Sequence, residues 1–177
     1  MRSFALVTGN LDKWREAERL LGRPLERIEL DLPELQAATT REVAVAKAAA
    51  AFAMVGRPVI VEDAGLELEA LGSFPGPFVK FWEKLGGMES MCRALDGTPN
   101  RAATAVCVLA WTDGTTPDVR VAEGRVHGTI AHAPRGSSGF GWDTIFVPDG
   151  DPRTFAEMTA TEKDLHSHRR RAWELAR

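Results

Sequence analysis

Short apolar runs alternate with amphipathic stretches along the first part of the chain. The apolar run 4–7 predicts a buried strand, and the alternating run 25–30 predicts a second one. Between them, apolar side chains recur at helical spacing from Leu11 to Leu21, which predicts a helix that ends at Gly22. Alternation of strands and helices is typical of an α/β fold.

A second helix and a third strand follow in the same manner. Thr39 and Glu42 form a capping-box pattern, which predicts that an Ala-rich helix begins there and stops at Gly56. The apolar run 59–61 predicts a buried strand that ends at the acidic pair 62–63.

The rest of the chain adds antiparallel strands and more helices. Phe78, Phe81 and Trp82 recur at helical spacing, which predicts a helix that packs these rings in the core. The remaining predictions are strands at 102–111 and 119–130 around the hairpin signal Asp113-Gly114, and a terminal helix at about 161–176. The elements together predict a mixed sheet with helices packed on it.

Composition narrows the class of protein. The 177 residues are 44% hydrophobic and 27% charged, and this length suits one α/β domain. The net charge of −3 argues against a nucleic-acid partner, and Cys92 and Cys107 are too few for a disulfide framework. The apolar tracts at Met1–Thr8 and Val43–Val55 are too short for a secretory signal or a membrane span. We therefore expect a cytoplasmic protein with no membrane partner.

The turn between the first strand and the first helix is a candidate phosphate site. Backbone N–H groups at a helix N-terminus attract phosphate, and Gly9 permits close approach. Thr8 and Asn10 offer further hydrogen bonds, and Lys13 offers a charge within reach of a phosphate oxygen. The alternative is a plain turn that Asn10 caps.

Acidic residues near a predicted strand end suggest a metal site. Mg²⁺ binds one or two carboxylates and keeps several waters, so Glu62 and Asp63 are candidates, with Glu34 from a neighbouring loop as a second ligand. The alternative is a solvated acidic turn. Lys47 interrupts an apolar helix face, so it either reaches solvent or meets an anion.

A glycine-rich segment, 134–143, is a candidate base-binding loop. Phe140 or Trp142 would stack on a purine, and Asp143 would accept a hydrogen bond from a base or sugar. The alternative is a turn whose aromatic rings cap the core.

A basic segment, 162–171, follows near the end of the chain. Lys163, His168 and Arg169 could donate to the keto oxygen of a base, although such a run is usually a solvated helix face.

These motifs occur in a specific order. They run as Thr8-Gly9-Asn10, Leu32-Pro33-Glu34, Glu62-Asp63, Phe74–Phe78, Pro134-Arg135-Gly136, Gly139–Asp143 and Ser167-His168-Arg169. In this order the chain resembles the inosine triphosphate pyrophosphatase family. The resemblance implies one two-lobed domain over residues 1–177, with a long mixed central β-sheet, helices on both faces and an active-site cleft between the lobes. It also implies hydrolysis of ITP, dITP and XTP to the monophosphate and pyrophosphate, which cleanses the nucleotide pool.

The resemblance further implies roles for particular residues, a Mg²⁺ cofactor and a homodimer. Glu34 and Asp63 would bind the metal, with Asp63 and Lys13 catalytic. The substrate-binding residues would be Thr8, Gly9, Asn10, Lys13, Lys47, Ala64, Lys80, Phe140, Gly141, Trp142, Asp143, Lys163, His168 and Arg169. The chain departs from the family at Ala64, Thr144 and Asp164, which puts substrate preference in question more than activity.

Two other interpretations compete. One is a Maf-like pyrophosphatase that acts on pyrimidine or modified nucleoside triphosphates. The other is a non-catalytic module that binds nucleotides or RNA through Arg169–Arg171. Strongly salt-dependent RNA binding without turnover would favour the second.

Overall fold

The structure is a computed structural model that describes residues 4–177, so the first three residues of the Met1–Thr8 stretch lie outside the described residues. Within this range the strands are β1 (Ala5–Val7), β2 (Arg27–Ile28), β3 (Val59–Leu68), β4 (Pro75–Gly76), β5 (Ala102–Thr112), β6 (Arg120–Ile130) and β7 (Phe146–Pro148). The helices are α1 (Leu11–Leu21), α2 (Thr40–Val55), α3 (Val79–Ala94), α4 (Ala160–His166) and α5 (His168–Leu175). Three short 3₁₀ turns are η1 (Glu69–Leu71), η2 (Gly141–Thr144) and η3 (Phe155–Glu157).

Among the described residues, the seven strands form one mixed sheet. β1 pairs in parallel with both β2 and β3, whereas β4 runs antiparallel to β3 and β7 runs antiparallel to β6. The strand order is β2-β1-β3-β5-β6-β7, with β4 beside β3. Parallel neighbours need a crossover connection, which α1 and α2 supply, and antiparallel neighbours accept shorter loops. The predicted mixed α/β fold class is confirmed.

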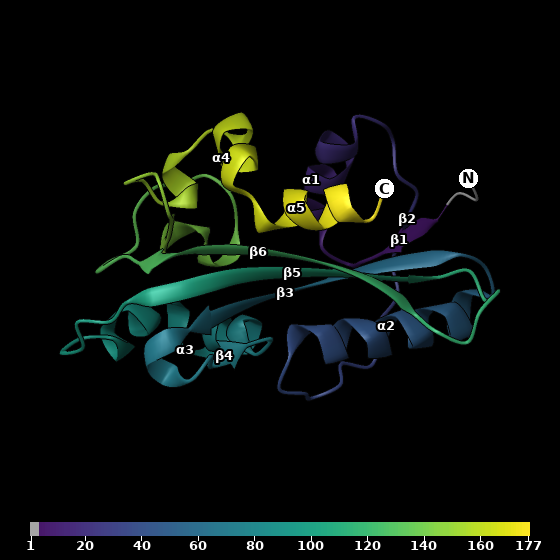
Figure 1. Cartoon of the computed structure of the whole chain (residues 1–177), viewed down its shortest axis with the longest axis horizontal. Helices are drawn as coiled ribbons and strands as arrows, with labels where there is room; N and C mark the ends of the chain where they lie inside the picture. Colours follow the sequence, from purple (N-terminus) through teal and green to yellow (C-terminus); the bar gives the residue numbers. More distant parts are fainter. Residues whose placement is uncertain (1–3) are drawn as a thin grey trace. The chain divides into compact units, whose positions relative to one another are not determined.

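The chain folds into two compact units, and β3, β5 and β6 contribute residues to both. Unit 1 comprises residues 4–64 of the described range, 107–124 and 169–177. Figure 1 shows α1 and α5 on one face of its strands and α2 on the other. Its core joins Leu6 and Ile60 from the strands to Trp173 of α5.

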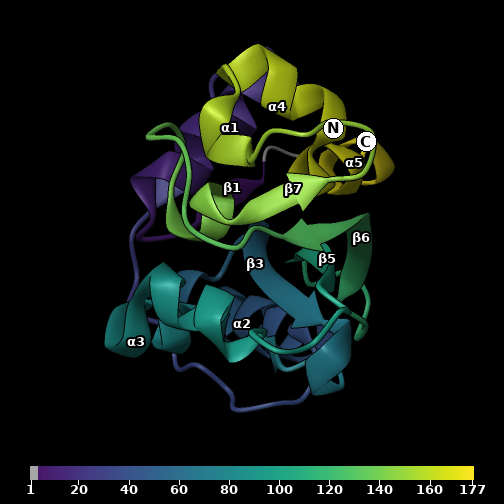
Figure 2. The ribbon, with the colours of Figure 1, turned by 90° about the vertical axis from the view of Figure 1, so that its left-hand side faces the viewer.

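Unit 2 comprises residues 65–106 and 125–168. In Figures 1 and 2, α3 lies on one face of its strands and α4 on the opposite face. Its core brings Met91 of α3 together with Phe146 of β7 and Phe155 of η3. In residues 4–177, no helix is long and apolar enough to cross a membrane.

The predicted helix ends are confirmed. The Thr39 hydroxyl accepts from the Glu42 amide at 3.2 Å, and the Glu42 carboxylate accepts from the Thr39 amide at 3.1 Å. Gly22 and Gly56 end their helices with φ of 64° and 70°, where a residue without Cβ is favoured.

Other predictions need correction. The strand that was predicted to end at the acidic pair 62–63 continues to Leu68, so Glu62 and Asp63 lie within β3. The predicted strand 25–30 is only Arg27–Ile28. The predicted terminal helix is two helices, because Ser167 leaves the helical conformation with ψ of 126°.

The predicted core face of α3 was also partly wrong. Phe81 is 44% exposed, and the buried positions are instead Val79, Met91 and Cys92. Trp82 lies one turn after Val79 and packs against the same core. Gly87 has φ of 69° inside the helix, so the helical repeat before it does not continue in phase to Met91.

Candidate functional site

The turn that precedes α1 is held by its own side chains. The Asn10 side-chain oxygen accepts from the amides of Asp12 and Lys13 at 2.9 and 3.0 Å, and Thr8 accepts from the Asn10 amide at 3.1 Å. A Cβ placed on Gly9 would meet no atom within 4 Å, so the turn is open at that point. The turn is therefore capped by Asn10, as the alternative interpretation predicted. The NH₂ group of Asn10 and the open space beside Gly9 also suit an anion.

Lys47 joins the two predicted metal ligands. Its Nζ donates to Glu34 at 3.1 Å and to Asp63 at 2.8 Å. Burial by itself lowers the pKa of this ammonium, but the two carboxylates outweigh burial and raise it. The lysine thus meets an anion, and carboxylates from a loop and from β3 converge on one cation.

This geometry fits a site for a divalent metal that is completed by substrate and water. No group of three or more His, Cys, Asp or Glu side chains within residues 4–177 is arranged to hold a metal alone. Mg²⁺ is usually held by one or two carboxylates together with phosphate oxygens and waters. Glu34 and Asp63 could supply these two carboxylates, because they lie close enough together for the Lys47 ammonium to contact both.

The neighbouring acid, Glu62, belongs to a different cluster. It accepts from the Arg169 Nε at 2.9 and 3.0 Å, and it lies 3.6 Å from the Lys13 Nζ. Arg169 also donates to Glu16 of α1. Burial lowers the pKa of a guanidinium, but Glu62 and Glu16 outweigh burial and raise the pKa of Arg169 well above its ordinary value.

This buried cluster contains a residue that the sequence reasoning missed. Glu16 is three residues after Lys13, so both lie on the same face of α1, and that spacing was an available signal. Arg169 was predicted to bind the base together with Lys163 and His168. The structure brings its guanidinium to Glu16 and Glu62 in unit 1, whereas Lys163 and His168 belong to unit 2.

In unit 2, Asp143 fixes the glycine-rich turn. Its carboxylate accepts from the Phe140 amide at 2.9 Å and from the Lys163 Nζ at 2.7 Å, and both Asp143 and Lys163 are buried. Lys163 also lies over the Phe140 ring, 5.2 Å from its centre. A Cβ at Gly139 would come within 2.2 Å of Asp143, so this position needs glycine. The structure thus brings Phe140, Asp143 and Lys163 together.

The other predicted base contacts are packed more deeply. Trp142 is only 8% exposed and lies with its ring centre 5.0 Å from that of His168. The His168 ring stacks on Phe155 at 6.2 Å. Phe140 is half-buried, and Lys80, in the first turn of α3, is exposed. Of the two aromatic candidates, Phe140 is the more exposed residue.

A second residue missed by the sequence reasoning, Glu83, lies against this turn. A Cβ at Gly141 would stand 3.6 Å from the Glu83 Oε2. Partial burial, followed by the charge of Asp143, raises the pKa of the Glu83 carboxyl. Nothing in the sequence around Glu83 pairs it with η2, because the two segments lie almost sixty residues apart in the chain.

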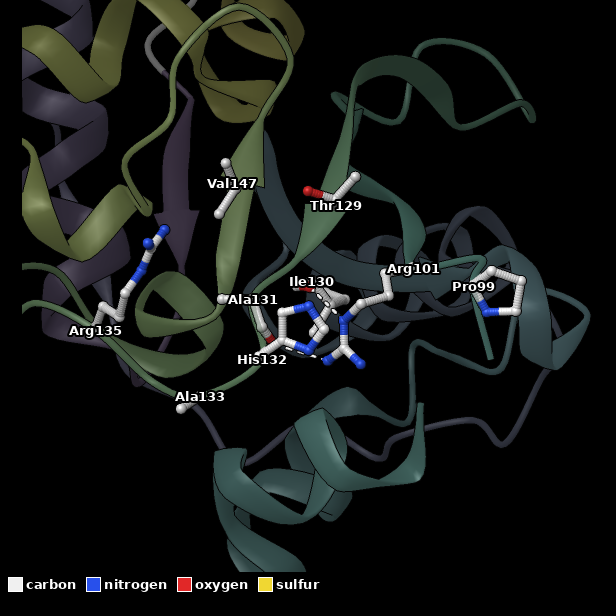
Figure 3. Close-up of a pocket in the computed structure, with 9 residues that line it drawn as sticks. All are labelled: Pro99, Arg101, Thr129, Ile130, Ala131, His132, Ala133, Arg135 and Val147. Atoms are coloured by element: carbon white, nitrogen blue, oxygen red, sulfur yellow. Dashed lines mark hydrogen bonds between the residues drawn. The ribbon is translucent and has the colours of Figure 1, made fainter. Parts of the chain in front are cut away.

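A separate pocket of about 550 Å³ lies in unit 2 and includes none of the predicted site residues. Its lining is formed by Pro99, Arg101, Thr129, Ile130, Ala131, His132, Ala133, Arg135 and Val147 (Figure 3). Arg101 donates to the carbonyls of Ile130 and Ala131 within it, both at 2.8 Å. These hydrogen bonds hold the residue before β5 to the end of β6, which is a structural role, so we assign the pocket no substrate.

Comparison with known proteins identifies the family. The model described as the Ham1 family matches residues 4–177, which is nearly the whole chain. The chain belongs to the Ham1 family. This Ham1 protein is 41% identical to the dITP/XTP pyrophosphatase of Methanopyrus kandleri, over 95% of this chain and 90% of that one. It is 40% identical to the inosine triphosphate pyrophosphatase of Mycosarcoma maydis, over 98% and 92% of the two chains.

The fold of this Ham1 protein agrees with solved structures. A HAM1 protein from Coxiella burnetii has a TM-score of 0.83 at 31% identity, and the match covers 98% of this chain and 95% of the other. The Staphylococcus aureus Ham1 protein has a TM-score of 0.81 at 29% identity, with 97% and 95% covered. The family resemblance and the fold inferred from the sequence motifs are confirmed.

Proposed function

We propose that this protein hydrolyses ITP, dITP and XTP to the monophosphate and pyrophosphate, and so removes these non-standard purine nucleotides from the pool. The names of its relatives support this proposal. The observation that carries the proposal is the convergence of Glu34 and Asp63 on the Lys47 ammonium. An enzyme that hydrolyses a triphosphate needs positive charge beside the phosphate oxygens, and carboxylates in fixed positions can hold a metal ion there.

Glu34 and Asp63 are the residues that would hold Mg²⁺. When bound, the ion would neutralise negative charge on the triphosphate oxygens. Lys47 has three N–H donors and uses two of them on these carboxylates, which leaves one for a phosphate oxygen. Asp63 would accept a proton, at a carboxylate oxygen, from the water that attacks the α-phosphorus.

The turn before α1 would position the triphosphate. Thr8, Gly9 and Asn10 offer the amide and side-chain donors, and Lys13 offers a point charge. Glu62 and Arg169 would keep the Lys13 ammonium in place, since Glu62 lies within 3.6 Å of it and is itself fixed by Arg169. Phosphoryl transfer depends mainly on such positioning and charge neutralisation.

Residues of unit 2 would bind the base. Phe140 and Trp142 would offer aromatic rings, and Lys163 and His168 would offer donors to the 6-keto oxygen. Asp143 holds Lys163 and the Phe140 amide, so its effect on the base would be through them. Lys80 and Gly141 of unit 2 and Ala64 of unit 1 are further proposed substrate contacts. Arg169, which is buried on Glu62 and Glu16, would act on the substrate through Glu62 and Lys13.

Product analysis with ITP and Mg²⁺ tests the proposal. We expect IMP and pyrophosphate in equal amounts, and release of orthophosphate would overturn attack at the α-phosphorus. A parallel panel of XTP, GTP, UTP and dTTP separates this activity from a Maf-like one, which would favour pyrimidines. Salt-dependent RNA binding without turnover of any of these nucleotides would instead support a non-catalytic role.

We also propose that the protein acts as a homodimer in the cytoplasm. Light scattering of the purified protein tests the first part, with a monomer mass of 19.3 kDa as the reference. Fluorescence microscopy of a tagged full-length chain tests the second.

A further inference from the structure

The Lys47 ammonium takes up carboxylate oxygens that Glu34 and Asp63 would offer to a metal ion. Its Nζ donates to the Glu34 Oε1 at 3.1 Å and to the Asp63 Oδ1 at 2.8 Å, so one positive charge already stands between the two carboxylates. Mg²⁺ contacts its carboxylate oxygens at about 2.0–2.1 Å. An ammonium and a divalent ion that share these two oxygens would therefore have to occupy the same space.

Burial makes this competition strong. The side chains of Lys47 and Asp63 are 14% and 11% exposed, and that of Glu34 is 35% exposed. Solvent screens such charges less than it screens charges on an open surface, so a divalent ion beside the ammonium would meet strong repulsion. The ammonium also leaves the two carboxylates with one net negative charge between them, which weakens their attraction for a second cation.

The place of Lys47 in α2 keeps the ammonium at the site. Lys47 lies in the middle of the helix, and its neighbours on the same helix face, Ala44, Ala48 and Ala51, are buried. The backbone that carries Lys47 is thus packed against the core, so the ammonium leaves the carboxylates only by rotation within its own side chain. Phosphate oxygens would draw it away, because they supply both acceptors and negative charge.

We infer that Lys47 blocks the metal ligands in the enzyme without nucleotide, and that a triphosphate draws the ammonium away so that the divalent ion and the nucleotide bind together. This inference rests on the proposed function, since it assumes that the triphosphate reaches Lys47 and that Mg²⁺ binds Glu34 and Asp63. It gives Lys47 a role in the coupling of two ligands, besides its contact with phosphate. Coupling of this kind is reciprocal, so each ligand should strengthen the binding of the other by the same factor.

The test titrates Mn²⁺ into the nucleotide-free wild type, Lys47→Met and Arg41→Met. Mn²⁺ accepts the same oxygen ligands as Mg²⁺, and electron paramagnetic resonance measures its free concentration. Methionine keeps most of the lysine stem and removes the charge. We expect Lys47→Met to lower the Kd for Mn²⁺ by at least about tenfold, a factor typical of coupled sites. Addition of Asp63→Asn to Lys47→Met should abolish this gain, because it removes one of the two carboxylates that the ion would use.

Arg41→Met is the matched control for Lys47→Met. Arg41 belongs to the same helix, its side chain is 59% exposed, and it lies 4.0 Å from Glu123. The variant loses the same charge from the protein, so a general electrostatic effect on Mn²⁺ would appear in both. We expect the Kd of Arg41→Met to equal that of the wild type.

The wild type also tests the inference without any change to Lys47. Its Kd for Mn²⁺ should be much weaker without nucleotide than with a non-hydrolysable ITP analogue. Equal affinity in the two states, lost in Asp63→Asn, would overturn the inference, and so would equal Kd values for Lys47→Met and Arg41→Met. In either case ITP turnover by the wild type would leave the proposed function standing. A wild type that hydrolyses neither ITP nor XTP would overturn the proposed function, whereas the titrations of nucleotide-free protein would still decide whether Lys47 competes with the ion.

Discussion

Glu62 and Asp63 are adjacent in β3, yet their carboxylates pair with different basic side chains. Asp63 accepts from Lys47 of α2, whereas Glu62 accepts from Arg169 of α5. Successive side chains of a strand point to opposite faces, and α2 and α5 lie on opposite faces of the unit 1 strands (Figure 1). The acidic pair therefore divides into Asp63, which meets Lys47 and which we propose serves the chemistry, and Glu62, which belongs to the buried cluster with Arg169.

Neutralising Asp63 should stop catalysis without unfolding the protein. Asp63→Asn removes the charge that holds Lys47 and that would hold Mg²⁺, so we expect kcat for ITP to fall by at least about 100-fold. Asparagine has nearly the size of aspartate, so the thermal unfolding midpoint of the variant protein should change little. Steady-state kinetics with pyrophosphate detection at several Mg²⁺ concentrations measures the effect.

Asp31→Asn is the control for Asp63→Asn, because Asp31 is an exposed acid in the same loop as Glu34. It should retain wild-type turnover. Near-normal turnover of Asp63→Asn at saturating Mg²⁺ would remove Asp63 from the mechanism.

The buried cluster around Arg169 should matter for stability. Glu16→Ala removes one of the two carboxylates that neutralise a guanidinium with almost no solvent exposure. Leaving a buried charge short of partners is costly, so we expect the free energy of unfolding to fall by about 3 kcal/mol. Urea denaturation followed by tryptophan fluorescence measures the loss.

Arg15→Ala on the same helix provides the comparison for Glu16→Ala. Arg15 is exposed and its ion pair with Asp12 spans 3.6 Å, so the change should stay within about 0.5 kcal/mol. Equal stability of the two variants would contradict the assigned role of the cluster.

Local chemistry explains which parts of the fold could be predicted. The Thr39–Glu42 capping box and Gly22 act within a few residues of one another, so the sequence alone specified the ends of α1 and α2. The convergence of Glu34 and Asp63 could be predicted because the family motifs identified both residues.

Long-range pairing explains what could not be predicted. The acidic pair looked like a strand end because exposed carboxylates usually interrupt strands. Arg169, 107 residues away, pairs with Glu62 and allows the carboxylate to be buried inside β3. The position of Glu83 near the Gly141 turn likewise depends on how α3 packs, which no local pattern around either residue encodes.

Gly136 should resist substitution more than other glycines with positive φ. A Cβ there would lie 2.3 Å from the carbonyl carbon of Ala156, and φ is 82°. Backbone atoms cannot move aside as a flexible side chain can, so Gly136→Ala should cost about 3 kcal/mol or more. Gly150 has φ of 90° but open space around it, so Gly150→Ala should cost only about 1 kcal/mol. Chemical denaturation of the two variants measures the difference, and equal losses would show that the close contact carries no cost.

Arg101 should be required for the stability of unit 2. Its guanidinium donates to the carbonyls of Cys92 and Leu95 at the end of α3, at 3.0 and 3.2 Å. It also donates to Ile130 and Ala131 at the end of β6, both at 2.8 Å (Figure 3). Arg101→Met keeps much of the apolar stem and removes all four bonds, so we expect a loss of about 3 kcal/mol in the free energy of unfolding.

Arg93→Met tests whether that loss is specific to Arg101. Arg93 lies in the last turn of α3, is exposed and pairs with Glu89 at 3.6 Å, so its removal should change stability by less than about 0.5 kcal/mol. Hydrogen exchange of the α3 amides adds a local readout, because loss of the bonds to Cys92 and Leu95 should speed exchange there first. Unchanged exchange in α3 together with wild-type stability of Arg101→Met would mean that the four carbonyls find equivalent partners without the guanidinium.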